Sequence, residues 1–311
     1  MVTTPYALIF GPADVSHMMK DMQRLYATHP LVRARFGQVA RSADMDVDTI
    51  LRKTPPPDDA SCMQVVSLGL LAGMLGIADD IIEQRGAPSC VGGISLGEVA
   101  ALCVAGGLTL DDATALIRQR VDMPDAEDET VGFVMVMEEG GRAFYHQPPE
   151  MRIAVDYGPI HQGIGSLLMV AGLRRALEGR GQEGSGVLEV LPPALCNSAY
   201  HTPYRRRIAE QVDAYLQGCA LPAPRYPVVT CLPEIGVVND PQGIRQMCVR
   251  GETETLSVPA MIRQMQSFDV ADVICIGPFL RSLNMDFGGV SASFRDEQWV
   301  DDISSSLSTL E

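Results

Sequence analysis

Lysine is nearly absent from this sequence. Of the 24 basic residues only Lys20 and Lys53 are lysines, and the 39 acidic residues bring the formal net charge at pH 7 to −15. A chain this acidic is repelled by nucleic acids and by anionic membrane surfaces. The composition therefore predicts no nucleic-acid partner and no broad membrane-binding surface.

The cysteines and histidines lack the spacing of a metal site. The eight cysteines stand singly without a CxxC pair, and the five histidines form no HxH or HxxxH pair. Zinc sites usually show such pairs. We therefore expect no metal ion, and we expect most of the cysteines to be buried free thiols in a reducing cytoplasm.

Long hydrophobic runs are also missing. No stretch reaches the roughly 18 uninterrupted apolar residues that a transmembrane helix needs. The first residues, MVTTPYALIF, show no positive segment followed by an apolar core, so we expect no signal peptide and a cytoplasmic location. The 311 residues, 46% of them hydrophobic, suffice for one large domain or for two.

Short apolar runs alternate with helical patterns in much of the chain. Buried strands are predicted at residues 6–10, 90–91, 227–231 and 272–278. Helices are predicted at residues 61–86, 96–106 and 110–123. This alternation predicts an α/β fold with a parallel sheet.

The pattern changes after Met123, where an acidic connector begins. Four short strands then follow at 131–137, 152–156, 166–172 and 186–192, with a helix at 173–181 before the last of them. They indicate a small α+β subdomain inserted in the larger domain. We therefore expect a large domain of residues 1–126 and 196–300, a small subdomain of residues 127–195, and a flexible tail at 301–311.

The pentapeptide Gly93-Ile94-Ser95-Leu96-Gly97 stands between a predicted strand and a predicted helix. In that position GxSxG is typical of a nucleophile elbow, in which glycine avoids collisions around a strained serine. Ser95 would lie at a helix N-terminus, where free N–H groups favour a developing anion. The pentapeptide alone leaves open the alternative of an ordinary glycine-rich turn.

The surroundings of this pentapeptide are more specific. Residues 93–120, GISLGEVAALCVAGGLTLDDATALIRQR, closely resemble the Gly-His-Ser-Leu-Gly-Glu block of malonyl-CoA:acyl carrier protein transacylases and of polyketide synthase acyltransferase domains. NSAYHTPY (197–204) resembles the segment that carries the family's catalytic histidine, and ICIGPFLRSL (274–283) its C-terminal Gly-Pro segment. The resemblance extends over roughly residues 5–290 and implies an α/β-hydrolase-like large domain with an inserted ferredoxin-like subdomain.

The resemblance also implies the catalytic roles. Ser95 would be the nucleophile and His201 the base that takes its proton, since a serine hydroxyl alone is a weak nucleophile. In this family a backbone carbonyl orients the histidine, and we expect that carbonyl in the loop 250–257. Arg120 stands at the family's position for the arginine that binds a malonyl carboxylate by two hydrogen bonds. On the residues alone, His201 also fits a surface histidine and Arg120 an ordinary arginine at a helix end.

Several residues bear on the acyl pocket. Ile94 stands where the family has histidine, and Ala13 stands where it has the glutamine that contributes an N–H to the oxyanion hole. We expect the N–H groups of Ala13 and Leu96 to form that hole. Tyr200, directly before His201, makes the tetrapeptide Ser-Ala-Tyr-His closer to the family's malonyl signature, His-Ala-Phe-His, than to its methylmalonyl signature, Tyr-Ala-Ser-His. The departures, which include the segment 156–166, indicate a specialised relative rather than the housekeeping enzyme of fatty-acid synthesis.

We therefore expect a discrete, trans-acting acyltransferase of polyketide-type biosynthesis that takes an acyl group, malonyl by preference, from a coenzyme A or carrier thioester. Its partner would be an acyl carrier protein, and no bound cofactor is expected. An acidic carrier would need a basic patch, which we place at Arg205, Arg206 and Arg207 and, across the cleft, at Arg174, Arg175 and Arg180. The alternatives are a carrier-to-carrier transferase for a preassembled acyl or aminoacyl group, an acyl-thioester hydrolase, and a non-catalytic carrier-binding scaffold.

Overall fold

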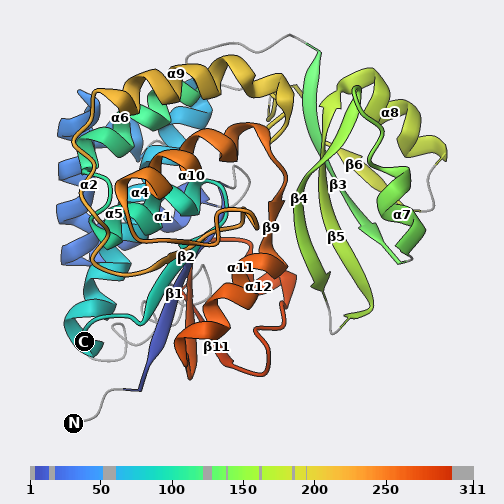
Figure 1. Ribbon diagram of the computed structural model, residues 1–311. Coiled ribbons are helices and arrows are strands. Elements are labelled where there is room, and N and C mark those ends of the chain that lie inside the picture. Colours follow the sequence, from blue (N-terminus) through green and yellow to red (C-terminus); the bar gives the residue numbers. More distant parts are fainter. Residues whose placement is uncertain are drawn as a thin grey trace.

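The chain folds around two β-sheets that lie side by side (Figure 1). The computed structural model describes residues 4–13, 18–51, 61–121, 128–137, 139–160, 163–183, 186–193 and 195–295. Most of the predicted acidic connector and the predicted tail at 301–311 lie outside these residues. The fold is α/β with mixed sheets.

The larger sheet has six strands in the order β11-β10-β1-β2-β7-β8. Its strands are β1 (Tyr6–Phe10), β2 (Cys90–Gly93), β7 (Val228–Val229), β8 (Val237–Val238), β10 (Asp272–Ile276) and β11 (Ser291–Arg295). All neighbouring pairs are parallel except β7 with β8. The predicted parallel core is therefore confirmed, with one short antiparallel strand at its edge.

Helices surround this sheet (Figure 1). They are α1 (Met18–Thr28), α2 (Pro30–Ala43), α3 (Val47–Ile50), α4 (Ser61–Arg85), α5 (Leu96–Ala105), α6 (Leu110–Val121), α9 (Arg206–Gln217), α10 (Pro241–Thr253), α11 (Val258–Met265) and α12 (Leu280–Leu283). Short 3₁₀ helices span Pro203–Arg205 and Gln266–Phe268. The predicted helices at 61–86, 96–106 and 110–123 are confirmed within two residues at each end.

Helix α4 is the central helix of the large core. Within it, Met63–Arg85 is long and apolar enough to cross a membrane by length and composition, but 83% of its most apolar 18-residue window is buried inside the fold. It lies against α1, α2, α5 and α6. An apolar helix covered on most sides is the expected core element of a globular domain.

The smaller sheet has five strands in the order β6-β3-β5-β4-β9. Its strands are β3 (Glu129–Val136), β4 (Met151–Ile160), β5 (Gly165–Leu173), β6 (Leu188–Val190) and β9 (Leu256–Ser257), and its helices are α7 (Glu139–Phe144) and α8 (Arg174–Glu183). The four predicted strands and the helix between them are confirmed. The fifth strand, β9, comes from the segment after α10 and pairs with β4, so it joins the two parts of the fold.

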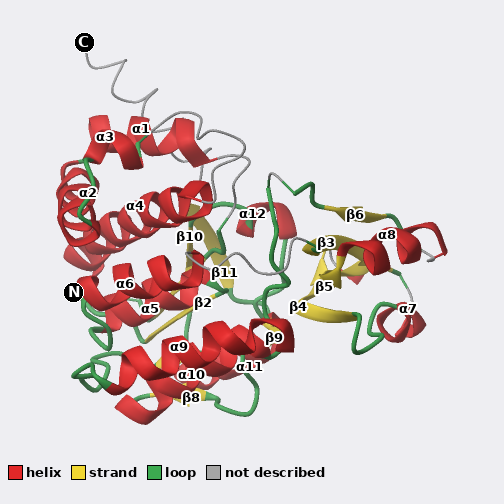
Figure 2. Ribbon diagram, turned by 90° about the horizontal axis from the view of Figure 1, so that it is seen from above, coloured by secondary structure: helices red, strands yellow, loops and turns green. Residues whose placement is uncertain are grey.

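The two faces of the smaller sheet have different neighbours. Alternate residues of β3 and β5, such as Val134 and Val170, pack with Leu177 of α8 in a small core. The residues between them, such as Val131 and Met169, pack toward the larger sheet. Figure 2 shows α7 and α8 on the outer side of this sheet, away from the six-stranded sheet. The space between the two sheets is where the candidate site lies.

Candidate active site

Ser95 occupies a strained turn between β2 and α5. Its backbone angles are φ 56° and ψ −110°, a conformation that residues with side chains rarely adopt. A Cβ on Gly93 would lie 2.1 Å from the carbonyl carbon of Gly97, and one on Gly97 would lie 2.2 Å from the carbonyl oxygen of Phe10. Only glycine fits these two positions. The turn therefore has the geometry that the GxSxG pattern predicts.

His201 lies against this serine although it is 106 residues away in the sequence. Its Nε2 is 3.0 Å from Oγ of Ser95, and its Nδ1 is 2.5 Å from the carbonyl oxygen of Gly251. A carbonyl oxygen can only accept, so Nδ1 carries the proton and Nε2 is free to accept the serine hydroxyl. This is the arrangement of a nucleophile and its base.

Burial keeps His201 uncharged at neutral pH. Desolvation outweighs the hydrogen bond to Gly251 and the nearby charge of Glu252, and it lowers the pKa of His201 to about 4. The orienting carbonyl lies within the predicted stretch 250–257. However, Gly251 belongs to the last turn of α10, so the expectation that the whole stretch is a loop was wrong.

The two predicted oxyanion donors lie at the same cavity as Ser95. Leu96 is the first residue of α5, where a helix leaves its N–H groups without an intrahelical partner. The next two N–H groups, of Gly97 and Glu98, donate to the carbonyls of Ile94 and Ser95. Ala13 follows β1 and also lines the cavity.

The cavity between the sheets has a volume of about 470 Å³. Most of its lining is apolar, and three rings of it, Phe133, Tyr157 and Phe279, contact one another at centroid distances of 5.4 to 6.5 Å. Its polar lining gathers Ser95, His201, Arg120, Tyr200, Arg205, Glu252 and Glu98. Residues from both sheets and from both halves of the sequence thus meet in one pocket, which is the common form of a ligand site.

Ile94 was wrongly predicted to shape the acyl pocket. Its side chain is fully buried in the core with Ala7 and Cys90, and it is not among the residues that line the cavity. Ser95 lines the cavity, whereas Ile94 packs in the core beneath it.

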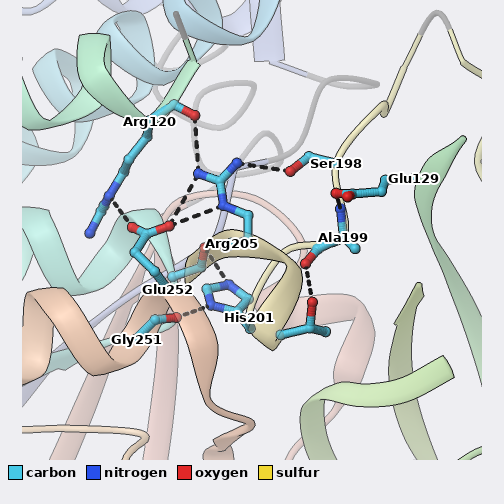
Figure 3. A network of polar contacts seen from close by, with 10 residues as sticks. Arg120, Glu129, Ser198, Ala199, His201, Arg205, Gly251 and Glu252 are labelled. Atoms are coloured by element: carbon cyan, nitrogen blue, oxygen red, sulfur yellow. Dashed lines mark hydrogen bonds and ion pairs between the residues drawn. The ribbon is translucent and has the colours of Figure 1, made fainter. Parts of the chain in front are cut away.

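Three charged residues form a cluster at the cavity wall, which we call the Arg120–Glu252–Arg205 cluster (Figure 3). Nε of Arg120 lies 2.6 Å from Oε1 of Glu252, and Nε and Nη2 of Arg205 lie 3.2 and 3.1 Å from its Oε2. Burial alone would raise the pKa of Glu252. The charges of Arg120 and Arg205 outweigh that effect and hold the pKa below its usual value. Glu252 is therefore an anion shared by two cations.

The position of Arg205 corrects its predicted role. Its side chain is 1% exposed, donates to Oγ of Ser198 and to the carbonyl of Arg120, and lies over the ring of Tyr200 with 4.8 Å between Cζ and the ring centroid. A side chain enclosed in this way cannot contact a carrier protein. Arg205 belongs to the wall of the site and not to a docking surface.

The other predicted docking residues divide into two groups. Arg206 and Arg207 at the start of α9, and Arg175 on α8, are exposed. Arg174 is half-buried and donates to the carbonyls of Leu191 and Cys196, which fixes it to its own subdomain. The structure thus leaves Arg206, Arg207 and Arg175 as the accessible part of the predicted patch, together with the half-buried Arg180.

Glu98 is a further buried acid at the cavity. It accepts hydrogen bonds from the Thr230 hydroxyl and the Cys231 N–H through Oε1. Burial is the largest influence on this group and raises its pKa to about 7.

Sequence reasoning did not identify Glu252 or Glu98 as site residues. Glu98 lies in the GISLGE block and could have been found by asking why an acid follows an apolar turn. Glu252 gives no such signal, because it stands among other polar residues in RGETETLS. In the part of the chain that the structure describes, no three metal-binding side chains come together, and seven cysteines carry free thiols.

Comparison with known proteins supports this description of the fold. No protein-family model matches the chain. The spectinabilin polyketide synthase system protein NorA' of Streptomyces orinoci is 35% identical over 100 residues, which are 31% of this chain and 3% of that protein. The chain thus matches only a small part of this long relative. A malonyl CoA-acyl carrier protein transacylase of Salmonella typhimurium is 23% identical over 79% of this chain and 80% of its own length.

Solved structures match almost the whole chain. A type II polyketide synthase malonyl-transacylase, solved in complex with its acyl carrier protein, superposes with a TM-score of 0.81 at 19% identity and covers 97% of this chain and 100% of its own. A malonyl-CoA:acyl carrier protein transacylase of Xanthomonas oryzae pv. oryzae gives a TM-score of 0.81 at 22% identity, with 99% of each chain covered. The chain has the fold of these transacylases, and the resemblance predicted from its sequence is confirmed.

Proposed function

We propose that this protein is a discrete acyltransferase that transfers a malonyl group to the phosphopantetheine thiol of an acyl carrier protein in polyketide-type biosynthesis. The observation that carries the proposal is the Ser95–His201 pair, 3.0 Å apart, in one cavity with Arg120. The resemblance to malonyl transacylases in both sequence and fold supports the same substrate and partner. A cytoplasmic location fits the free thiols and the expected substrates.

The first half-reaction would acylate the serine. His201 Nε2 takes the Ser95 hydroxyl proton while Oγ attacks the thioester carbonyl carbon. The negative charge on the carbonyl oxygen would be stabilised by the N–H groups of Leu96 and Ala13. As the C–S bond breaks, His201 returns the proton to the leaving thiolate, and malonyl-Ser95 remains.

The second half-reaction reverses these steps with a different thiol. The phosphopantetheine thiol of the carrier gives its proton to His201 and its sulfur attacks the ester carbon. The ester bond to Oγ breaks, and Ser95 recovers its proton from His201. The carbonyl of Gly251 holds the imidazole in the required tautomer in both halves and takes no proton itself.

The architecture supports the same proposal. The small subdomain has the element order β3-α7-β4-β5-α8-β6, which is that of a ferredoxin-like unit. We take residues 127–195 as this unit and residues 1–126 and 196–300 as a hydrolase-like domain. The cavity lies where the two units meet, which lets a substrate arm enter between them.

A second candidate is a carrier-to-carrier transferase for a preassembled acyl or aminoacyl group. Two observations favour it: the cavity of about 470 Å³ has room for more than a malonyl group, and Arg120 already has Glu252 as a partner. Acyl-enzyme formation from malonyl-, methylmalonyl-, acetyl- and aminoacyl-thioesters, measured by intact mass, separates the two candidates. Malonyl should give the fastest adduct, and an adduct formed only from acyl groups that lack a free carboxylate would favour the second candidate.

A further inference from the structure

The three residues of the Arg120–Glu252–Arg205 cluster make different contacts. Glu252 uses its two carboxylate oxygens for two different guanidinium groups: Oε1 lies beside Nε of Arg120, and Oε2 accepts from Nε and Nη2 of Arg205. Figure 3 shows the two arginines approaching the carboxylate from different sides. The Arg120 contact is an ion pair without a hydrogen bond at Nε, so it consumes none of the five N–H donors of the guanidinium.

The Nη donors of Arg120 are available to a ligand. Among the residues that the structure describes, its Nη1 and Nη2 donate no hydrogen bond, and its side chain is 20% exposed at the cavity. These two nitrogens form a fork that matches a carboxylate bidentately. A guanidinium held at Nε presents that fork in one fixed direction.

Arg205 keeps the net charge around the Arg120 guanidinium positive. Glu252 alone would neutralise Arg120, and an incoming carboxylate would meet a pair without net charge. Arg205 supplies a second positive charge and is itself fixed by Ser198 Oγ. It also donates to the carbonyl of Arg120 at 3.0 Å, so it ties down the backbone of the residue whose side chain Glu252 holds. The three side chains together carry one positive charge, enough for one carboxylate.

We infer that Glu252 is the positioning residue of this site: it holds Arg120 at Nε so that Nη1 and Nη2 face the carboxylate of a malonyl-type substrate. The inference rests on the proposed function, because it takes Arg120 as the carboxylate-binding group. Glu252 directly follows Gly251, whose carbonyl orients His201. The last turn of α10 thus positions His201 through the backbone carbonyl of Gly251 and Arg120 through the side chain of Glu252.

The test compares two substrates in three variants. Removing Glu252 alone would leave Arg205 buried without a counter-charge, so the main variant is Glu252→Leu combined with Arg205→Met, which removes both charges. Glu252→Gln keeps an acceptor oxygen but no charge. Glu254→Gln is the matched control, since Glu254 lies at the end of the same helix, outside the cavity lining, and pairs with Arg250 at 2.7 Å. Acylation of Ser95 is followed with malonyl-CoA and with acetyl-CoA.

The double variant should raise the KM for malonyl-CoA about tenfold or more and lower the malonyl-to-acetyl ratio of kcat/KM by a similar factor. Glu252→Gln should fall between it and the wild type, and Glu254→Gln should match the wild type. An unchanged ratio in the double variant overturns the inference. An equal loss for both substrates also overturns it, because a merely structural residue behaves in that way.

A second measurement separates this inference from the proposed function. In protein labelled with ¹⁵N-arginine, the Nε–Hε bond of Arg120 should show a high order parameter in the wild type and in Glu254→Gln, and a low one in the double variant. This readout needs no substrate. A wild type that ignores malonyl-CoA would refute the proposed function, whereas a mobile Arg120 Nε in the wild type would refute the positioning role.

Discussion

The proposed reaction end of the cavity, at Ser95, and its proposed recognition end, at Arg120, are built by different means. At the reaction end, Ser95 and His201 both have positive φ angles, of 56° and 57°, and their partners are a helix N-terminus and a backbone carbonyl. At the recognition end, the Arg120 side chain pairs with Glu252, and the Arg120 backbone carbonyl accepts a hydrogen bond from Arg205. The elbow at Ser95 is encoded by glycines close in the sequence, whereas the charged cluster joins elements that lie far apart.

This difference explains what the sequence could predict. The GISLG turn needs Gly93 and Gly97 because a Cβ at either would collide with backbone, so a short local pattern carries the elbow. Strand and helix positions followed from apolar periodicity for the same local reason. The Arg120–Glu252–Arg205 cluster comes from α6, α10 and the 3₁₀ turn before α9, and no local pattern marks such a meeting.

Arg205 illustrates most clearly what the sequence alone could not predict. It stands in YRRR, where three identical residues follow one another, and the sequence alone does not tell which one is buried. The fold turns Arg205 into the site and leaves Arg206 and Arg207 exposed. In contrast, helix α2 could have been found, because its buried residues Val32, Phe36, Val39, Ala40 and Ala43 recur at helical spacing.

The largest loss of acylation rate is expected from a substitution at the reaction end. His201→Ala should slow acylation of Ser95 by about 10²–10⁴-fold, because general-base help contributes about that much. His146→Ala is the control, since His146 is an exposed histidine on the small subdomain. Stopped acylation reactions analysed by intact mass give the rates. A loss of less than tenfold would remove His201 from the role of base.

The pH dependence of the wild type sharpens this point. The base must be neutral, so acylation should stay level as the pH falls from 8 to about 5 and should decline only near the pKa of His201, about 4. A histidine with an ordinary pKa would lose activity already below about pH 6.5. An acid limb at that higher pH would contradict the lowered pKa of His201.

A substitution at the recognition end should lower activity only with the substrate that carries a free carboxylate. Arg120→Ala removes the carboxylate fork and should lower kcat/KM for malonyl-CoA by roughly 100-fold, since hydrogen bonds to charged groups contribute about 1.5–3 kcal/mol. The rate with acetyl-CoA should hold or rise. Arg118→Ala, an exposed residue on the same helix, serves as control. If malonyl and acetyl transfer fall together, the two ends of the cavity do not act separately.

A smaller effect is expected at Tyr200, which lines the cavity directly before His201. Tyr200→Ser should open space for an α-methyl group and shift the methylmalonyl-to-malonyl ratio upward by about tenfold, because one methyl group in a pocket contributes about 1–3 kcal/mol. Competition between the two coenzyme A thioesters measures the ratio. No shift would mean that the ring does not border the α-carbon.

The smallest effect is expected from substitutions on the surface outside the cavity. Arg206→Glu combined with Arg207→Glu should raise the KM for an acidic carrier protein several-fold and leave acylation from malonyl-CoA as it is, because these side chains are exposed and surface charges act mainly on association. Arg41→Glu, at an exposed position on α2, is the control. Equal changes in both half-reactions would exclude this surface as the carrier-docking site.

The central claim is that Ser95 carries the malonyl group while Arg120 selects it. The most direct measurement incubates wild type, Ser95→Ala and Arg120→Ala with malonyl-CoA and with acetyl-CoA and determines the intact mass and the modified peptide. The account predicts a malonyl ester on the Ser95 peptide of the wild type, no adduct in Ser95→Ala, and an acetyl but little malonyl adduct in Arg120→Ala. A malonyl adduct that persists in Ser95→Ala, or that forms equally well in Arg120→Ala, would contradict it.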